Sequence, residues 1–97
     1  MKSYEMMLIF IPEMDEGAVN EEVSKITSVI EKSKGTIQAT ELWGVKKLAY
    51  PIKHQDNGFY TLINFNSDTS ILPELDRLNK INDKILRHLI VKTGEGN

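Results

Sequence analysis

The middle of the chain reads GVKKLAYPI over residues 44–52, a run in which two adjacent lysines stand beside alternating apolar residues. This run ends a longer stretch, residues 36–52, that is rich in β-formers and predicts an extended strand. Gly44 in the middle of that strand indicates a bulge or bend. Pro51 has no N–H to donate to a neighbouring strand, so the strand is expected at an edge of a sheet.

A turn and a further strand follow the edge strand. Residues 54–58 read HQDNG and close on an Asn-Gly pair, whose residues tolerate a positive φ, so the turn is expected there. Residues 59–66 again have the composition of a strand. The two strands are therefore predicted to pair as a hairpin.

The N-terminal third predicts a strand followed by an amphipathic helix. Residues 4–11 are almost continuously apolar, which is typical of a strand buried on both faces. Asp15 is suited to cap the helix, and Gly35 is suited to end it with a left-handed residue. Glu21 and Glu22 are assigned to its solvated side. Its inward positions recur at helical spacing: Val19, Val23, Ile26 and Ile30.

The C-terminal third predicts a second helix, which Thr69 or Ser70 can cap, and a last strand over residues 85–93. The inward residues of this helix are expected to be Leu72, Leu75, Leu78 and Ile81. The element order βαββαβ is the split βαβ plan. We therefore expect an α+β, ferredoxin-like fold with a four-stranded antiparallel sheet and two helices on one face. One domain should span residues 1–97, with residues 93–97 as a short tail.

Composition narrows the function classes. Cysteine is absent, which excludes disulfides and thiol catalysis. Two histidines, His54 and His88, lack ligand-spaced neighbours, so no metal is expected, and no cofactor motif is present. His88 fits either a phosphate or base contact or an ordinary strand position. No apolar segment approaches the roughly 20 residues of a membrane span, and no signal peptide is visible, so we expect a cytosolic protein without membrane contact.

The net charge is −2, but the charges are segregated along the chain. Residues 5–31 contain seven carboxylates and one lysine, whereas residues 32–54 contain five lysines and one glutamate. Residues 77–92 contain five Lys or Arg residues and one acidic residue. Such segregation allows a local positive field on a net acidic protein, which is compatible with polyanion binding. Ordinary solvated faces are the alternative interpretation.

The predicted sheet has more apolar surface than two helices on one face can cover. Tyr60 and Leu62 point to the face opposite the helices, and a large exposed apolar patch typically marks a partner interface. Both are therefore candidates for a protein contact. Self-association, or a partly covered face with scattered apolar residues, is the alternative.

Other chemistry is not indicated by the sequence. No nucleophile stands beside an activating group, so catalysis and a small-molecule substrate are not expected. Residues 58–64 are faintly similar to the stacking strand of RNA-recognition motifs, but Thr61 and Asn64 occupy positions where that strand needs aromatic residues. RNA binding would therefore depend on backbone contacts and shape.

With Trp43 before it, GVKKLAYPI resembles the signature of the bacterial small-ribosomal-subunit protein six family, whose members carry Gly-x-(Arg/Lys)-(Arg/Lys)-Leu-Ala-Tyr-Pro-Ile. The resemblance extends over nearly the whole chain, through Lys2-Ser3-Tyr4-Glu5, Pro12, Asp15, Gly35, Gly58 and residues 85–92.

This resemblance implies a structural protein of the cytoplasmic ribosome rather than an enzyme. It implies binding to the central domain of 16S rRNA as a heterodimer with small-subunit ribosomal protein eighteen, and stabilisation of a multi-helix RNA junction during assembly. The favoured RNA-binding residues are Lys2, Lys46, Lys47, Lys53, His54, Arg87 and Lys92. Family members often carry Lys or Arg where this chain has Ser3, and many extend beyond residue 97. Contacts made by those positions are expected to be reduced.

Two other functions fit the same fold plan. A ferredoxin-like dimeric ligand-binding or regulatory module would pair through the apolar sheet face. An enzyme of the acylphosphatase kind would need an arginine in a phosphate-binding loop after the first strand, where residues 12–16 are instead acidic.

Overall fold

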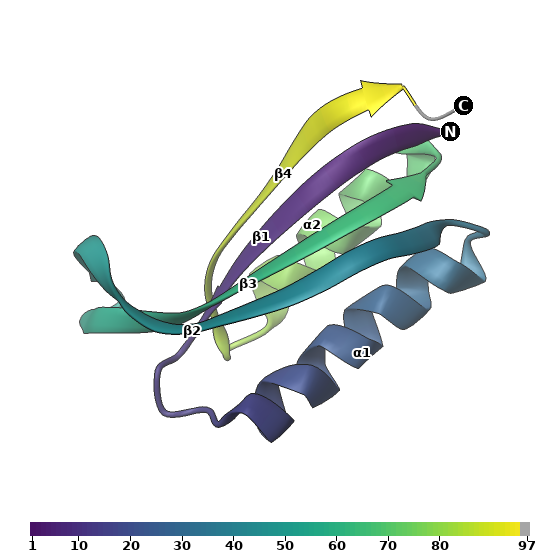
Figure 1. Ribbon diagram of the computed structural model, residues 1–97. Helices are drawn as coiled ribbons and strands as arrows, with labels where there is room; N and C mark the ends of the chain where they lie inside the picture. Colours follow the sequence, from purple (N-terminus) through teal and green to yellow (C-terminus); the bar gives the residue numbers. More distant parts are fainter. Residues whose placement is uncertain (96–97) are drawn as a thin grey trace.

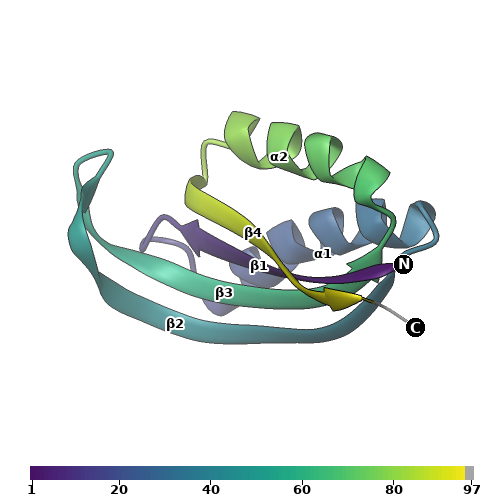
Figure 2. The same ribbon diagram turned by 90° about the horizontal axis from the view of Figure 1, so that it is seen from above.

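A four-stranded antiparallel sheet carries both helices on one of its faces (Figures 1 and 2). The computed structural model describes residues 1–95. Its elements are β1 (Lys2–Phe10), α1 (Glu16–Lys32), β2 (Thr36–Ile52), β3 (Gln55–Ser67), the 3-10 turn η1 (Thr69–Ile71), α2 (Leu72–Ile81) and β4 (Ile85–Glu95). The strand order is β2-β3-β1-β4. The predicted ferredoxin-like βαββαβ fold is therefore confirmed, with β2 at an edge as Pro51 requires.

The side chains of β1 point alternately to the two faces of the sheet, as the sequence predicts. Met6, Leu8 and Phe10 are fully buried beneath the helices, together with Ile63 and Phe65 of β3. Side chains alternate across a strand, so the intervening residues of β1 lie on the opposite face, which we call the open face. The inward positions of α1 are all buried in the same core: Val19, Val23, Ile26 and Ile30.

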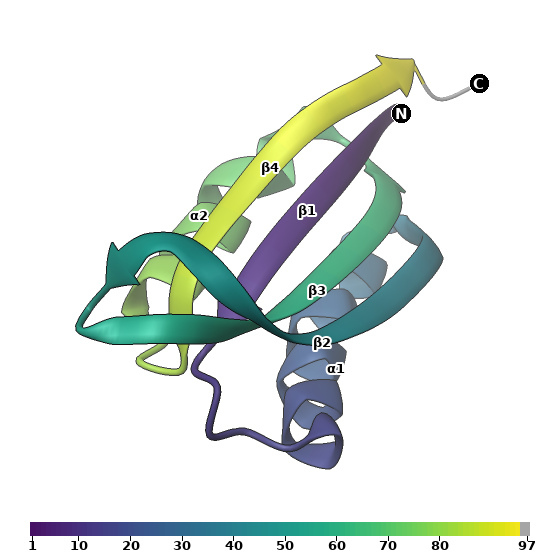
Figure 3. The ribbon, with the colours of Figure 1, turned by 60° about the vertical axis from the view of Figure 1, so that its left-hand side comes forward.

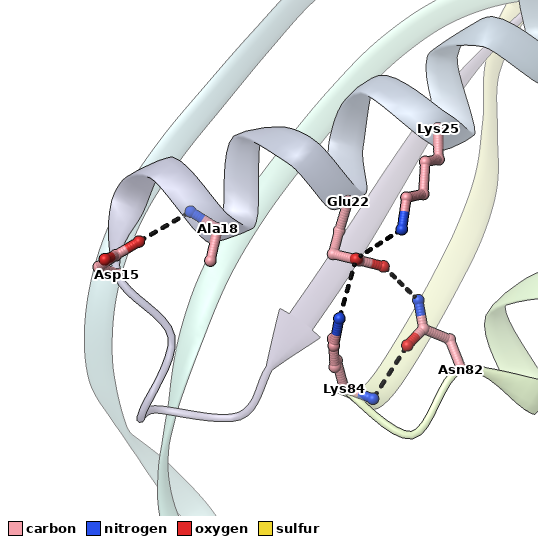
Figure 4. A network of polar contacts seen from close by, with 6 residues as sticks. All are labelled: Asp15, Ala18, Glu22, Lys25, Asn82 and Lys84. Atoms are coloured by element: carbon pink, nitrogen blue, oxygen red, sulfur yellow. Dashed lines mark hydrogen bonds and ion pairs between the residues drawn. The ribbon is translucent and has the colours of Figure 1, made fainter.

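Both ends of α1 have defined caps. Asp15 accepts a hydrogen bond from the Ala18 N–H at 2.8 Å, as a helix N-cap does (Figure 4). At the other end the left-handed residue is Lys34, with φ 67°, and not Gly35 as predicted. The N–H of Gly35 donates to the Ile30 carbonyl and that of Lys34 to the Glu31 carbonyl, which is the Schellman pattern.

The second helix differs from its prediction at both ends. Neither Thr69 nor Ser70 caps it: Asp68 accepts from the Ser70 N–H and caps the preceding turn η1, and α2 itself begins after Ile71 without a side-chain cap. Ile81 is 63% exposed, although it was predicted to point inward. Asn79, four residues after the buried Leu75, is buried instead, because positions spaced by three drift around a helix with about 3.6 residues per turn and Ile81 no longer faces the sheet.

The turn between β2 and β3 comes earlier than predicted. Lys53 and His54 adopt positive φ values of 49° and 66° and form the turn, while Asn57 and Gly58 pair with β2 inside the ladder. Gly58 is needed there for close packing: a Cβ atom would overlap the side chain of Ile9. The resulting hairpin is long, and its end, residues 44–58, is called the arm below.

The arm bends over the open face. The ladder between β2 and β3 is irregular at Gly44, whose φ is 89°, which confirms the predicted bulge. Beyond this point the end of β2 crosses in front of β1 and β4, on the side away from the helices (Figure 3). Leu48 packs there against Ile9 and Leu86 in a second, smaller core. One end of the open face is therefore covered by the chain itself.

The predicted tail begins inside a strand. β4 continues to Glu95, and Gly94 and Glu95 pair with Ser3 and Lys2 of β1, with Thr93 at an irregularity of the ladder. The remaining residues 96–97 lie outside the described part of the chain. In residues 1–95 no helix has the length and apolar character needed to cross a membrane.

Candidate functional site

The arm and the start of β4 bring together five of the seven basic residues predicted to contact RNA. Lys46 and Lys47 pair with Gly58 and Asn57 of β3, close to the turn formed by Lys53 and His54. Arg87 lies opposite Ile9, near the end of β1 over which the arm bends. These residues come from two segments that are distant in sequence, and the fold places them at one end of the sheet.

The two lysines of the signature are exposed along the sheet edge. Successive side chains on a strand point to opposite faces, so Lys46 and Lys47 place positive charge on both sides of the arm. Because β2 is an edge strand, no further strand of the described sheet covers them. Leu48, the next residue, is buried in the second core and anchors the same segment.

The arm contacts β4 through two polar interactions. Arg87 Nη1 donates to the Tyr50 hydroxyl at 2.6 Å, and Lys53 Nζ lies 3.5 Å from the carbonyl oxygen of Ile85. Tyr50 is 57% exposed, although it stands in an alternating apolar run. Its place in an alternating run gave no signal of a hydrogen bond to a residue so far along the chain.

A hollow of about 270 Å³ lies between the arm, α2 and β4. Four basic side chains line it: Lys53, Lys80, Arg87 and His88. The sequence gave no reason to include Lys80, because helix position alone does not show which strand end it approaches. The hollow therefore extends the predicted basic surface onto α2.

Two of these four side chains already have an acidic partner. Asp76 accepts from His88 Nε2 at 2.7 Å and pairs with Lys80 Nζ at 3.2 Å. The hydrogen bond with His88, followed by that with Lys80, lowers the pKa of Asp76 below its ordinary value. The structure therefore directs the His88 ring toward α2. Lys53 and Arg87 have uncharged oxygen partners instead.

The other two predicted RNA contacts lie at the opposite end of the sheet. Lys2 pairs with Ser67 of β3, and Lys92 pairs with Tyr4 of β1. They line two different hollows, of about 350 and 460 Å³ respectively. The seven predicted RNA-binding residues therefore form two separate groups. The arm group consists of Lys46, Lys47, Lys53, His54 and Arg87, and the other group consists of Lys2 and Lys92 at the opposite end of the sheet.

An apolar row on the open face begins at the second core, against which Met7 packs, and continues beyond it. Met7 of β1 lies between Leu62 of β3 and Leu89 of β4 in the ladder, so all three side chains share the open face. Leu89 and the nearby Val91 are exposed. Tyr60 is half-buried and packs against the second core beneath the arm. The sequence identified Tyr60 and Leu62 but missed the two β4 residues, whose pairing partner was unknown.

A first-helix carboxylate also departs from its prediction. Glu22 was assigned to the solvated side of α1 with Glu21, but only Glu21 is exposed. The Glu22 carboxylate accepts hydrogen bonds from Lys25, Asn82 and Lys84 (Figure 4). This network connects α1 to the loop before β4. In residues 1–95 no group of three or more His, Asp or Glu side chains could hold a metal ion.

The comparison with known protein families agrees with the signature. The model of the family described as Ribosomal protein S6 matches residues 3–92. The chain belongs to the ribosomal protein S6 family. Its members are ribosomal proteins rather than enzymes, which excludes the acylphosphatase alternative and places this S6 protein in the ribosome.

Individual relatives cover nearly all of this S6 protein. Small ribosomal subunit protein bS6 of Clostridium botulinum is 44% identical over 91 residues, which are 94% of this chain and 97% of the relative. The bS6 protein of Clostridium kluyveri is 45% identical over 92 residues, 95% and 97% of the two chains. The crystal structure of 30S ribosomal protein S6 from Thermotoga maritima superposes with a TM-score of 0.86 at 33% identity, covering 94% of this chain and 86% of that one.

Proposed function

We propose that this S6 protein binds the central domain of 16S rRNA as a heterodimer with small-subunit ribosomal protein eighteen. In that complex it stabilises a multi-helix RNA junction during assembly of the small subunit. Membership of the S6 family supports a ribosomal role. The observation that carries the RNA part of the proposal is the arm group, in which Lys46, Lys47, Lys53, His54 and Arg87 lie at one end of the sheet.

The arm group suits contact with phosphates rather than with bases. RNA-binding sheets that read bases present exposed aromatic rings. Here Tyr60 is half-buried beneath the arm, and Thr61 is buried on the helix side. The exposed basic side chains of the arm are suited to the RNA backbone, which binds through charge and counterion release. We therefore assign the arm to phosphate contacts.

The protein partner is assigned to the uncovered part of the open face. Leu62 and Leu89 lie on either side of Met7, which packs at the border of the second core, on the side of the sheet away from the helices. Exposed apolar rows of this kind are typical of protein interfaces. The RNA surface and the partner surface would then be adjacent, because the arm bends over the same face.

Binding by this chain alone should be weak, because the net charge is −2 and few lysines lie in the arm. Addition of protein eighteen should make RNA binding tight, since two ligands that order one surface favour each other's binding. A titration of a central-domain rRNA fragment with the chain, with and without protein eighteen, measures this coupling. Equal affinity in the two titrations would contradict the heterodimer.

A second experiment tests the arm lysines. Removing one phosphate-binding side chain should reduce the slope of log K against log salt by about one, so the double variant Lys46→Ala/Lys47→Ala should reduce it by about two. Lys32→Ala, at the exposed end of α1, is the control. If the double variant and the control have the same slope as the unchanged protein, the two arm lysines do not contact RNA.

A further inference from the structure

Tyr50 joins the arm to the sheet by an apolar and a polar contact at once. In the run 48–52 the alternation of a strand puts Leu48, Tyr50 and Ile52 on one face. Leu48 and Ile52 pack against the second core, and Tyr50 lines the hollow of about 120 Å³ that remains beneath the arm. Its hydroxyl accepts a hydrogen bond from Arg87 of β4, which lines the same hollow.

We propose that Tyr50 is a positioning residue for RNA binding. By accepting a hydrogen bond from Arg87, it holds the arm closed, so that Arg87 and the arm lysines form one fixed basic surface. This inference rests on the proposed function, that the arm binds rRNA, and it adds a residue that carries no charge. Tyr50 itself makes no contact with RNA in this scheme.

The chemistry of the acceptor explains why a tyrosine suits this role. A guanidinium group has five N–H donors, and a phenol hydroxyl occupies one of them without neutralising the charge. Lys53 is held in a similar way, close to the uncharged carbonyl oxygen of Ile85. By contrast, Lys80 and His88 in the same hollow are paired with the carboxylate of Asp76. The two contacts that close the arm therefore keep its cations available for phosphate.

Closing the arm before binding also lowers the cost of binding. A hairpin end that moved freely would lose conformational entropy when RNA fixed its side chains, and a surface that is already ordered avoids most of this loss. The second core contributes the apolar part of this order through Leu48. The Tyr50–Arg87 hydrogen bond fixes the distance between the arm and β4.

The test uses Tyr50→Phe, which keeps the ring and removes the hydroxyl. Because this variant loses a single hydrogen bond, amide hydrogen exchange in residues 46–58 should become about two- to tenfold faster. The affinity of the complex with protein eighteen for the central-domain rRNA fragment should fall by a similar factor of about two to ten. Tyr4→Phe is the matched control, because it removes a hydroxyl that bonds to Thr69 at the opposite end of the sheet, and it should leave both measurements unchanged.

A double-variant cycle separates positioning from direct contact. If Tyr50 acts through Arg87, Tyr50→Phe should have no further effect on RNA affinity in the Arg87→Ala background. An equal reduction in both backgrounds would show that Tyr50 contacts RNA itself and would overturn the proposal. Unchanged affinity and exchange for Tyr50→Phe, with normal binding by the unchanged protein, would overturn the positioning role alone. Absence of RNA binding by the unchanged protein would instead overturn the proposed function. In that case the hydrogen exchange of Tyr50→Phe, compared with that of the unchanged protein, would still decide whether the hydrogen bond holds the arm.

Discussion

Replacing Glu22 with Ala should destabilise the protein, although the residue lies on a charged stretch of α1. The Glu22 side chain is only 7% exposed, and its carboxylate accepts from Asn82 Nδ2 at 2.9 Å, from Lys25 Nζ at 3.1 Å and from Lys84 Nζ at 3.2 Å. Asn82 and Lys84 belong to the loop between α2 and β4, so the carboxylate connects the first helix to a loop near the C-terminal end of the chain (Figure 4). Removing it releases that loop from α1.

The size of the effect follows from the exposure of the three donors. The side chains of Lys25 and Lys84 are 72% and 53% exposed, so each ion pair should contribute only about 0.2–1 kcal/mol. The bond from the Asn82 amide should contribute about 0.5–1.5 kcal/mol. We therefore expect Glu22→Ala to lower the free energy of unfolding by about 1–3.5 kcal/mol. Both lysines can return to water, so the loss stays below the roughly 3–5 kcal/mol typical of breaking a fully buried pair.

The same network predicts a pH dependence. Burial alone would raise the pKa of Glu22, but the hydrogen bonds from Asn82, Lys25 and Lys84 outweigh it and lower the pKa below its ordinary value. A carboxylate with a lower pKa in the folded state stabilises the fold above its unfolded pKa of about 4.3, and this stabilisation is lost as the pH falls through the folded pKa. Glu22→Gln cannot ionise, so it should lack this part of the acid destabilisation.

Urea unfolding at pH 7 and across the acid range measures both effects. Glu21→Ala is the matched control, because Glu21 is adjacent in sequence and exposed. The control should change the free energy of unfolding by less than about 0.5 kcal/mol. An equal loss of stability in Glu22→Ala and Glu21→Ala would show that the Glu22 network does not stabilise the fold. A loss of stability with acid as steep in Glu22→Gln as in the unchanged protein would show that ionisation of Glu22 does not contribute.

Three further predictions concern the core, the end of α1 and the open face. Ile26→Ala, in the buried face of α1, should lower the free energy of unfolding by about 2–5 kcal/mol in urea titrations, and a loss near zero would show that the site collapses or is not buried. Lys34→Gly should raise the melting temperature, because a left-handed φ costs a residue with a Cβ atom about 1–2 kcal/mol and glycine avoids this cost. Gly35→Ala should lower the melting temperature, because a Cβ atom there would lie 2.8 Å from a backbone oxygen of β3. Changes of the same sign in both variants would contradict the assignment of Lys34 as the left-handed residue. Leu89→Ala should shift stability by about 0.5 kcal/mol or less, because the side chain is exposed, yet it should weaken association with protein eighteen in a pull-down or calorimetric titration. Unchanged association would remove Leu89 from the interface.

The elements that the sequence predicted well are those with a strong local pattern. The helical spacing of α1 indicates one buried face, and the structure buries it together with the helix-side residues of β1. The predicted burial of β1 on its other face is only partial, because there Ile9 alone is buried. Pro51 and Gly44 also act locally, through a missing N–H and a permitted positive φ, so the edge position of β2 and its bulge followed from the chain alone.

The predictions that failed depended on contacts between distant segments. The Asn-Gly pair at residues 57–58 suits a tight turn, but packing against Ile9 fixes a glycine inside the ladder and leaves Lys53 and His54 to make the turn. Glu22 appeared to be a surface carboxylate because its partners, 60 and 62 residues further along, could not be paired with it from sequence. Side-chain type alone does not reveal such a partner.

In the candidate site too, the sequence predicted the features that depend on local residue type and missed those that depend on contacts between distant segments. The basic residues were found by their charge, but their separation into an arm group and a pair near the N-terminus depends on strand register. Lys80 and Tyr50 were missed because each becomes relevant only when the arm bends over β4. Leu89 was missed because its row on the open face requires the pairing of β4 with β1.

The signature run GVKKLAYPI carries both apolar residues that pack in the second core and lysines that stay exposed, which a single strand allows. Alternate residues from Leu48 onward face the second core and fix the position of the arm, while the preceding lysines remain exposed on both of its sides. A charged surface that binds a backbone without reading bases gains little from the identity of each lysine and much from the rigidity of the strand that carries it. If the arm binds RNA as proposed, its apolar residues contribute to that binding, because they determine where the lysines are held.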